Sequence, residues 1–595
     1  WQHYMLQCLH PDRKIAPKHA MRISNSLKTI CAHLFASCEE KQAQQLLAPL
    51  LAQVMQAEGD DRFILIDALC HVPVRYLSSA PREALCARLT QMLGSGEVRL
   101  DMILMRCMQR LLPLDGYAPL LLPSLHRYQP HGEYQIALAH LRGRLLGLSS
   151  AHLTRAQITQ LHLSDLKNVV HWTVKLEQMQ MLCEYAAENP AAAFHTAMHL
   201  SNLMSVSEHL PVREAAGEHL LAIAPLLLAD QINEIIIDLT RELETGQEQI
   251  SLFIAPYLGK LICRLPEKEL SETLGQLEGL ARGASVLPAQ VAMHTLGQAL
   301  SALPDAAQAA RERIVGILMT GVSHYDPAVH QTALCVLCRD YFGSENAGDG
   351  RREVFISLHK KLLTILCEPR SDRLAALNRA AMLNHLYRFV VRQEVERGVF
   401  QFPAQKPAAF FPGTFDPFSV GHKQIVEEIR ERGFEVYLAV DEFSWSKKTL
   451  PKLLRRQIVG ISIADQPDTY LFPDDIPINI AMPRDLARLK GLLPGRAVYL
   501  VAGSDVIENA SAYHTAQPGG AAEYNHIIFC RDGTAEDGAA LCARISGKVQ
   551  LLSLPPFYET VSSTRIRESV DRKLDISMLV DPVVQTLIYR QGLYV

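Results

Sequence analysis

The spacing of hydrophobic residues changes near residue 400. From about Ser24 to about Glu396, apolar residues recur every three to four positions in stretches rich in Leu and Ala, separated by short breaks containing Pro, Gly, Asp or Ser. This spacing predicts a succession of amphipathic helices. Their apolar stripes are too wide for helices that pack on one side only, so each helix is expected to have neighbours on two sides.

Two of these stretches begin alike. "PVREAAGEHLLAI" starts at Pro211 and "PAVHQTALCVLCR" at Pro327, so Val212 and Val329 lie 117 residues apart, which is three times 39. Apolar stretches near Ser251 and from Val291 fall close to the intermediate positions. A period of about 40 residues with two helices resembles helical solenoids of the HEAT or armadillo kind. We predict an all-α helical-repeat (HEAT-like) region over residues 1–400 that binds a protein partner; an irregular helical array is the alternative.

After residue 407, short β-rich runs alternate with helices. Pro403 and Pro407 interrupt any helix, which predicts a linker over residues 401–407. Five buried strands are predicted within "AAFF", "FEVYLAV", "AVYLVAG", "NHIIFC" and "VQLLSL". Strands alternating with helices predict an α/β Rossmann-like, doubly wound parallel sheet over residues 408–595, with ligands at the carboxyl ends of the strands.

Composition and charge narrow the class of protein. At 595 residues the chain is several times the usual domain of roughly 100 to 200 residues, so at least two cores are expected. Lys plus Arg (59) nearly balances Asp plus Glu (63), so neither a nucleic acid nor a membrane is predicted as a partner. The 13 cysteines lack regular spacing, which is typical of reduced thiols in a cytoplasmic protein.

Two side-chain pairs within the helical region have a structural and a chemical interpretation. Cys335 and Cys338 share a helix face, and buried helix cysteines are favoured over a redox or metal pair because no second ligand pair follows. His195 and His199 also share a face but lack the Glu of a zinc-hydrolase motif. Neither pair predicts a site, and we expect no metal held by protein ligands.

The first predicted strand ends in a glycine turn. In "FFPGTFDPFSVGH" the strand ends at Gly413, and a helix begins at about Val420 or Gly421. Gly413 lets the backbone turn sharply and approach a ligand. The helix N-terminus offers N–H groups to an anion, and His422 in the first turn can point its imidazole at the same anion. Taken alone, this stretch is weak evidence for an anion site, and a plain strand-to-helix turn is the favoured interpretation.

Polar residues follow the other predicted strands as well. They are Lys447, Lys448, Asp505 and Arg531, and Gly503 begins a glycine-rich turn. Near the C-terminus, Ser562, Ser563 and Thr564 are predicted to cap a helix that carries Arg567, giving hydroxyl and guanidinium donors for phosphate oxygens. Such features at five strand ends favour a phosphate-binding site over a set of structural caps.

The pairing of "GTFDPxxxGH" with a late "SSTxIR" resembles the adenylyltransferases and cytidylyltransferases of the HIGH superfamily, over roughly Pro407 to Val595. "FPGTFDPFSVGH" and "SKK" are similar to phosphopantetheine adenylyltransferase. "SSTRIR" and the ending "DPVVQTLIYRQGLYV" are more similar to nicotinate-nucleotide adenylyltransferase. "INIAMPRDLARLK" and Tyr513 depart from that second family in its acceptor-binding half, so the resemblance implies the nucleotide more firmly than the acceptor.

The resemblance implies adenylyl transfer from ATP to a phosphate-bearing acceptor with release of pyrophosphate. The favoured acceptor is nicotinate mononucleotide, a substrate of NAD biosynthesis, and Mg²⁺ would be bound mainly by phosphates. His422 and Lys448 would stabilise charge at the α-phosphate, and Arg567 would hold the leaving phosphates. The implied nucleotide-binding residues are Gly413, Thr414, Phe415, Asp416, Ser419, Gly421, Gly503, Asp505, Arg531, Ser562, Ser563 and Thr564.

Ser419 occupies the first position of an HxGH-like signature, where a hydroxyl can still donate to a phosphate oxygen. The alternative of another class is a catalytically degenerate nucleotide sensor on a helical scaffold, in which Ser419 would mark the loss of a catalytic residue. The presence of His422, Lys448, the serine cap and Arg567 favours an active enzyme.

Overall fold

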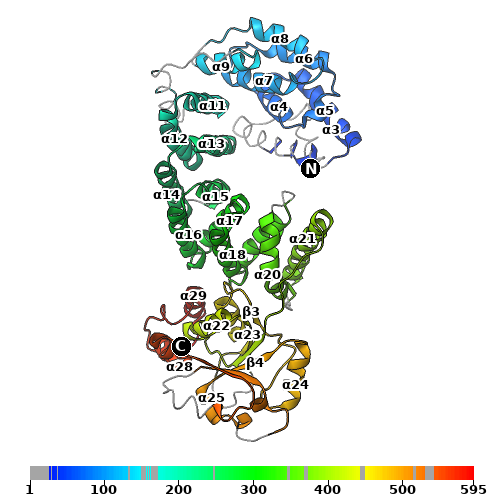
Figure 1. Cartoon of the computed structure of the whole chain (residues 1–595). Helices are drawn as coiled ribbons and strands as arrows, with labels where there is room; N and C mark the ends of the chain where they lie inside the picture. The colour runs from blue at the N-terminus through cyan, green and yellow to red at the C-terminus, as the bar shows by residue number, and fades with distance from the viewer. Residues whose placement is uncertain are drawn as a thin grey trace. The chain divides into compact units, whose positions relative to one another are not determined.

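The structure is a computed structural model, shown in Figure 1. It describes residues 38–131, 134–148, 172–245, 248–344, 349–367, 373–441, 449–513, 517–529 and 542–595, with isolated residues between 26 and 35 and at 156, 159 and 161. The chain forms two compact units, Trp1–Gln231 and Ile232–Val595. Within the described residues, no helix is long and apolar enough to cross a membrane.

The first unit is helical, as predicted. Its described helices include α3 (Glu40–Gln56), α4 (Asp61–Leu69), α5 (Val74–Leu77), α6 (Arg82–Met92), α7 (Val98–Leu111), α8 (Ala118–Arg127), α9 (Gln135–Leu145), α11 (Trp172–Glu188), α12 (Ala193–Val206) and α13 (Leu210–Ile223). In α7, Leu100, Leu104 and Leu111 are fully buried, at spacings of four and seven residues that place side chains on one helix face. His199 of α12 is buried, whereas His195 is exposed.

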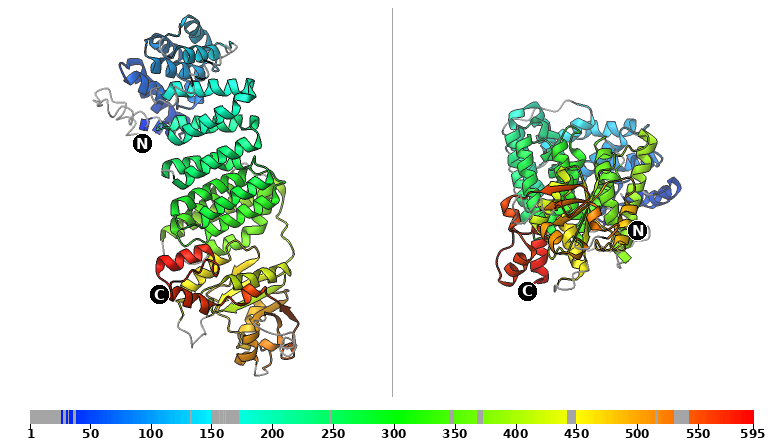
Figure 2. Two further views of the ribbon diagram at one scale, coloured as in Figure 1. Left: turned by 90° about the vertical axis from the view of Figure 1, so that its left-hand side faces the viewer. Right: turned by 60° about the horizontal axis from the view of Figure 1, so that its bottom comes forward.

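The helical array continues into the second unit. Its helices are α14 (Ala229–Thr245), α15 (Glu248–Ile262), α16 (Glu267–Arg282), α17 (Val286–Ala302), α18 (Gln308–Val322), α19 (Pro327–Leu334), the π-helix η3 (Cys335–Phe342), α20 (Asp349–Cys367) and α21 (Arg373–Arg397). The left view of Figure 2 shows α15 to α18 stacked side by side.

The predicted period of about 40 residues is present in this array. Helices α13, α15, α17 and α19 begin at residues 210, 248, 286 and 327, which are 38 to 41 residues apart. Val212, Ser251, Val291 and Val329, the four positions aligned in the sequence, fall in these four helices and are all fully buried. The helical-repeat prediction is therefore confirmed. Cys338 is buried in η3, where burial raises the pKa of its thiol to about 12.

The remainder of the second unit is built on a parallel sheet of six strands in the order β3-β2-β1-β4-β5-β6. The strands are β1 (Ala408–Gly413), β2 (Glu435–Val440), β3 (Thr469–Leu471), β4 (Val498–Gly503), β5 (Asn525–Phe529) and β6 (Val549–Leu552). The five predicted strands are all present. The edge strand β3 was not predicted, because three residues are too few to show a periodic pattern.

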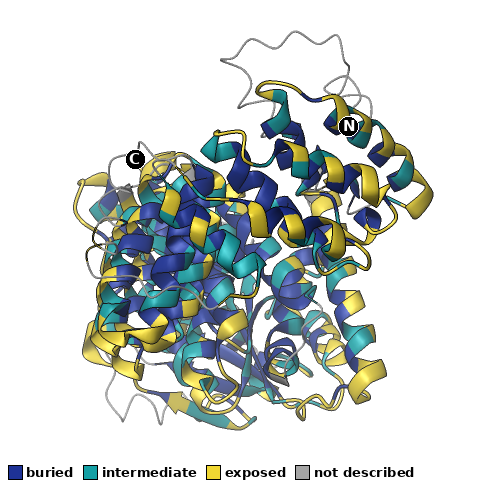
Figure 3. Cartoon of the chain, turned by 90° about the horizontal axis from the view of Figure 1, so that it is seen from above, coloured by how far each residue is buried: buried dark blue, intermediate teal, exposed yellow. Residues whose placement is uncertain are grey.

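Helices cover both faces of the sheet. They are α22 (Val420–Glu431), α23 (Lys452–Ser462), α24 (Pro483–Leu492), α25 (Ser504–Asn509), α27 (Pro556–Glu559), α28 (Ser563–Asp571) and α29 (Pro582–Gln591). Alternate side chains of β1 point to opposite faces: Phe411 packs in the core with Ile425 of α22, and Phe410 in the core with Leu486 of α24. In Figure 3, buried residues (dark blue) alternate with exposed ones along the helices. The doubly wound α/β fold is confirmed.

Candidate active site

A cleft of about 340 Å³ opens at the carboxyl ends of β1 and β4. The chain leaves β1 toward β2 and β3 on one side and returns to β4 on the other, so the order of the strands reverses at this point. Connections that diverge to opposite faces leave a crevice where doubly wound proteins bind their ligands. The position of the cleft is therefore the one that the fold predicts for a ligand.

Most of the predicted site residues lie together in this cleft. Those that line it are Gly413, Thr414, Phe415, Asp416, His422, Gly503, Asp505, Ser562, Ser563, Thr564 and Arg567. Ser419 and Gly421 are not among the lining residues. Lys447, Lys448 and Arg531 lie outside the described residues. Three segments distant in sequence thus meet here: the loop from β1 to α22, the start of α25 and the first turns of α28.

Gly413 is needed for a reason that the sequence did not show. Phe415 has a backbone φ of +46°, which is uncommon for a residue other than glycine. Its ring folds back over Gly413, where an added Cβ would lie 2.7 Å from the ring. The ring also packs edge-on against Phe411 and His422, each at 5.3 Å between centroids. Gly413 therefore makes room for a buried aromatic side chain that forms one wall of the His422 site.

His422 is oriented by Ser419. The Nδ1 atom of His422 lies 3.1 Å from the backbone N of Ser419 and 2.8 Å from its Oγ. A backbone N–H can only donate, so Nδ1 acts as the acceptor and the neutral ring carries its proton on Nε2. Ser419 Oγ in turn accepts from the backbone N–H of His422 at 3.3 Å, which caps α22. Ser419 is 2% exposed, so its hydroxyl orients His422 and is not a wall of the cleft.

Gly421 allows α22 to approach the chain that leads into α28. A Cβ at this position would lie 3.0 Å from the carbonyl oxygen of Tyr558 and 3.3 Å from that of Val561. This close approach brings the N-termini of α22 and α28 to the same cleft. Helix N-termini carry partial positive charge and favour anions.

The first turn of α28 is bonded to the loop after β1. Ser562 Oγ accepts from the backbone N–H of Arg565 at 3.2 Å, as expected of a cap. Ser563 Oγ donates to the carbonyl oxygen of Pro417 at 2.8 Å, and Arg567 Nη1 donates to that of Asp416 at 2.5 Å. Arg567 Nη2 donates to Thr564 Oγ1 at 3.2 Å. Arg567 is thus held in place by the loop that it faces.

Asp416 is the buried carboxylate of the site. It is 2% exposed, and its Oδ1 accepts from the hydroxyl of Tyr594 at 2.7 Å. Its Oδ2 is buried and has no hydrogen-bond partner among the described residues. Burial and the neighbouring Asp416 raise the pKa of Tyr594 above its ordinary value, so Tyr594 remains a hydrogen-bond donor. Tyr594 does not line the cleft itself, and it supports the site through this bond to Asp416.

Sequence reasoning missed several other residues of the site. Arg455 of α23 is 4% exposed, and its Nη1 donates to the carbonyl oxygens of Thr414 at 2.6 Å and Asp441 at 3.1 Å. Arg455 does not line the cleft, whereas Ile478, Asn479 and Ile480, from the loop between β3 and α24, do. Arg455 carries no local signal in the sequence, because it reads as one polar position of an amphipathic helix.

The arrangement gathers hydrogen-bond donors for an anion. The His422 Nε2–H, the Arg567 guanidinium, the Ser562–Thr564 turn and two helix N-termini surround one cleft. Such preorganised donors stabilise the charge that develops on phosphate oxygens during group transfer. No side chain in this set needs to act as a nucleophile for that chemistry.

One protein family matches the sheet domain. The cytidylyltransferase-like family matches residues 410–569, which confirms the predicted resemblance and supports nucleotidyl transfer as the general reaction class. No curated protein matches the chain.

Two solved structures are similar to different parts of the chain. Nicotinic acid mononucleotide adenylyltransferase of Plasmodium falciparum, complexed with NaAD, is 20% identical, covers 32% of this chain and 98% of its own, and has a TM-score of 0.28. Kap121p bound to Pho4p is 12% identical, covers 66% of this chain and 47% of its own, and has a TM-score of 0.32.

Proposed function

We propose that the sheet domain transfers an adenylyl group from ATP to a phosphate-bearing acceptor and releases pyrophosphate. One observation carries this proposal: His422, Arg567 and the N-termini of α22 and α28 converge on one cleft at the carboxyl ends of β1 and β4. The predicted helical-repeat region, residues 1–400, would serve in addition as a surface for a protein partner.

In the proposed reaction, a phosphate oxygen of the acceptor attacks the α-phosphorus of ATP. The new P–O bond forms as the bond to the β-phosphate oxygen breaks, and pyrophosphate leaves. The protein aligns the two reactants and stabilises the added negative charge. The Nε2–H of His422 would donate to the α-phosphate, together with Lys448, while Arg567 and the Ser562–Thr564 turn would bind the β- and γ-phosphates.

Magnesium is implied by the resemblance, and one atom of the cleft fits a cation. The described residues contain no group of three or more His, Cys, Asp or Glu side chains that could hold a metal ion. The ion would therefore be held mainly by the phosphates of ATP, whose charge it would partly neutralise. The buried Oδ2 of Asp416, which lacks a hydrogen-bond partner among the described residues, would face such a cation favourably.

Nicotinate mononucleotide is the acceptor that we favour. The segments that resemble nicotinate-nucleotide adenylyltransferase are "SSTRIR" and the C-terminal ending. Both contribute to the cleft, since Ser562–Thr564 and Arg567 line it and Tyr594 bonds to Asp416. Phosphopantetheine is the second choice, because "GTFDP" and a serine at position 419 resemble that family instead.

An acceptor panel tests the proposal. The full chain would be incubated with Mg²⁺ and ATP, or CTP, and with nicotinate mononucleotide, phosphopantetheine or no acceptor. Released pyrophosphate would be measured and the product identified by mass. We expect release that depends on ATP and on nicotinate mononucleotide. Binding of ATP without acceptor-dependent release for any pair would overturn transfer in favour of a nucleotide sensor.

A further inference from the structure

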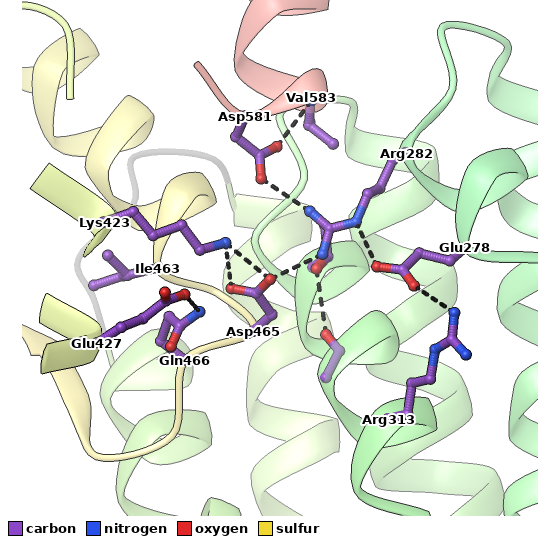
Figure 4. A network of polar contacts seen from close by, with 12 residues as sticks. Glu278, Arg282, Arg313, Lys423, Glu427, Ile463, Asp465, Gln466, Asp581 and Val583 are labelled. Carbon is purple, nitrogen blue, oxygen red and sulfur yellow. Dashed lines mark hydrogen bonds and ion pairs between the residues drawn. The ribbon is translucent and has the colours of Figure 1, made fainter. Parts of the chain in front are cut away.

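Arg282, the last residue of α16, binds two carboxylates of the sheet domain at once (Figure 4). Its Nη2 lies 2.9 Å from Asp465 Oδ2, and its Nη1 lies 2.9 Å from Asp581 Oδ2. Its Nε lies 3.1 Å from Glu278 of the same helix, which fixes the guanidinium plane. The Arg282 side chain is 15% exposed, so these ion pairs are largely shielded from solvent. The attraction between two charges is stronger in such a shielded position than at the surface.

Asp465 connects Arg282 to the helix that carries His422. Lys423, the next residue after His422 on α22, places its Nζ 2.9 Å from both carboxylate oxygens of Asp465. Burial alone would raise the pKa of Asp465, but the charges of Lys423 and Arg282 outweigh burial and lower it. The Asp465 carboxylate therefore forms ion pairs both with Arg282 of the helical array and with Lys423 in the first turn of α22.

Asp581 provides a second connection to the cleft. Its Oδ1 accepts from the backbone N–H of Val583 at 2.9 Å and caps α29. Two residues before Asp581, the carbonyl oxygen of Leu579 accepts a hydrogen bond of 3.0 Å from the backbone N–H of Val420, the first residue of α22. After α29 the chain reaches Tyr594, which donates to Asp416. Both carboxylates bound by Arg282 thus belong to segments that hold the cleft.

Lys361 of α20 binds the same turn from a second helix of the array. Its Nζ donates to the carbonyl oxygen of Ile463 and, at 2.7 Å, to that of Gln466. These residues flank Asp465, so the turn after α23 is held on both sides of the carboxylate. The position of Asp465 is accordingly set by the helical array as well as by the sheet domain.

We propose that Arg282 is a positioning residue of the active site, which fixes the first turn of α22, and with it His422, through Asp465, Lys423 and Asp581. For turnover this inference rests on the proposed function. Its consequence is that the helices of the second unit that carry Arg282 and Lys361 are a structural part of the enzyme, in addition to any role as a binding surface.

Arg282→Gln in the full chain tests the proposal, with Arg282→Lys as the conservative variant. Arg313→Gln is the matched control, because Arg313 bonds to Ser271 and Glu278 of α16. We expect Arg282→Gln to lower kcat for pyrophosphate release by roughly 10- to 100-fold, with KM for ATP within about twofold of wild type, because misplacing a catalytic group slows the chemical step. Arg282→Lys should recover part of this loss, and Arg313→Gln should stay within about twofold of wild type.

Hydrogen exchange gives a readout that does not need turnover. Backbone amides of residues 416–426 should exchange faster in Arg282→Gln than in wild type or Arg313→Gln. If the wild-type protein releases no pyrophosphate with any acceptor, the proposed function is wrong. Hydrogen exchange at residues 416–426 would still show whether Arg282 positions the first turn of α22. Exchange and kcat of Arg282→Gln within twofold of the Arg313→Gln values would overturn the inference.

A double-variant cycle covers the case in which Arg282→Gln does not fold. Arg282→Lys and Lys423→Gln would be compared singly and together. If both act through Asp465, their effects on exchange at residues 416–426 should be smaller together than their sum. Fully additive effects would show that the two residues act independently and would contradict the proposed connection.

Discussion

His422 is held by contacts to its Nδ1 atom and to its ring. The backbone N–H of Ser419 donates a hydrogen bond to Nδ1 of His422. The rings of Phe415 and Phe418 pack against the imidazole at 5.3 Å between centroids. We expect His422→Ala to lower kcat by roughly 100- to 1000-fold, the usual cost of removing one well-placed donor to a transition state. Acceptor-dependent pyrophosphate release measures this, and circular dichroism checks that the fold is retained. Near-normal release from this variant would remove His422 from the mechanism.

Replacing Ser419 is expected to affect stability more than catalysis, unlike replacing His422. Ser419→Ala removes a helix cap and the hydroxyl beside Nδ1, but the backbone N–H of residue 419 still donates to that nitrogen. We therefore expect the free energy of unfolding to fall by about 1 kcal/mol, the typical value for an N-cap, and kcat to fall much less than in His422→Ala. Urea unfolding and steady-state kinetics measure the two effects, with Ser419→Thr as the control that keeps the hydroxyl. Equal losses of kcat in Ser419→Ala and His422→Ala would indicate that the hydroxyl itself contacts the substrate.

The sequence identified the residues that carry local signals and missed those defined by distant contacts. Gly413 and His422 stand in a short motif, so their proximity follows from one strand-to-helix turn. The ring of Phe415 over Gly413 and the Arg455 bonds to Thr414 depend on backbone geometry and on a helix about 40 residues away. The sequence predicted that Ser419 donates to a phosphate oxygen. It could not show that the Ser419 side chain bonds to His422 of α22 instead.

At the scale of elements, the residues after α29 bond to the loop that lines the cleft. Tyr594 donates to the buried carboxylate of Asp416, so Tyr594→Phe would leave that oxygen with one partner fewer. We expect the free energy of unfolding to fall by roughly 1.5 to 3 kcal/mol, the range for hydrogen bonds to charged groups. Urea unfolding measures it, and Tyr589→Phe, at a half-exposed position of α29, is the matched control. A Tyr594→Phe variant as stable as Tyr589→Phe would show that the hydroxyl contributes nothing to the fold.

Most elements of the sheet domain followed from periodicity and turn residues. The apolar spacing predicts helices around residues 422–433, 451–465, 484–493 and 564–572, and these correspond to α22, α23, α24 and α28. A fifth helix, predicted around residues 538–547, lies partly outside the described residues, and its described part from residue 543 onward is not helical. The edge strand β3 was not predicted; it is three residues long and lies between Asp468, with φ of +54°, and Pro473. β3 is defined by its pairing with β2, which is distant in sequence, and three residues are too few to show the residue preferences of a strand.

At the scale of the whole molecule, the change in sequence pattern near residue 400 does not coincide with the boundary between the two compact units. The sequence pattern changes from helices to strands and helices at residues 401–407, whereas the second compact unit begins at Ile232 and includes helices α15 to α21. No local signal could predict this grouping. The contacts that join array to sheet domain, such as Lys361 with Gln466 and Arg282 with Asp581, link residues 105 and 299 positions apart.

Lys361 makes the stability of this unit depend on pH. It is 7% exposed, and burial lowers its pKa from the ordinary 10.5 to about 7, because a buried ammonium loses its hydration. Between about pH 7 and pH 10.5 the unfolded chain therefore carries a proton that the folded chain lacks. Stability should rise with pH across this window, by up to about 1.4 kcal/mol per pH unit, and the contribution should level off below pH 7.

Lys361→Met isolates this contribution. The difference in free energy of unfolding between wild type and Lys361→Met, measured with urea at pH 7, 8 and 9, should shift in favour of wild type as the pH rises. Lys268→Met, which removes an exposed lysine of α16, is the control, and its difference from wild type should stay level. A difference for Lys361→Met that also stays level would mean that Lys361 keeps its proton in the folded chain up to pH 9. The two carbonyl oxygens of Ile463 and Gln466 would then be stabilising an ammonium ion rather than accepting from a neutral amine.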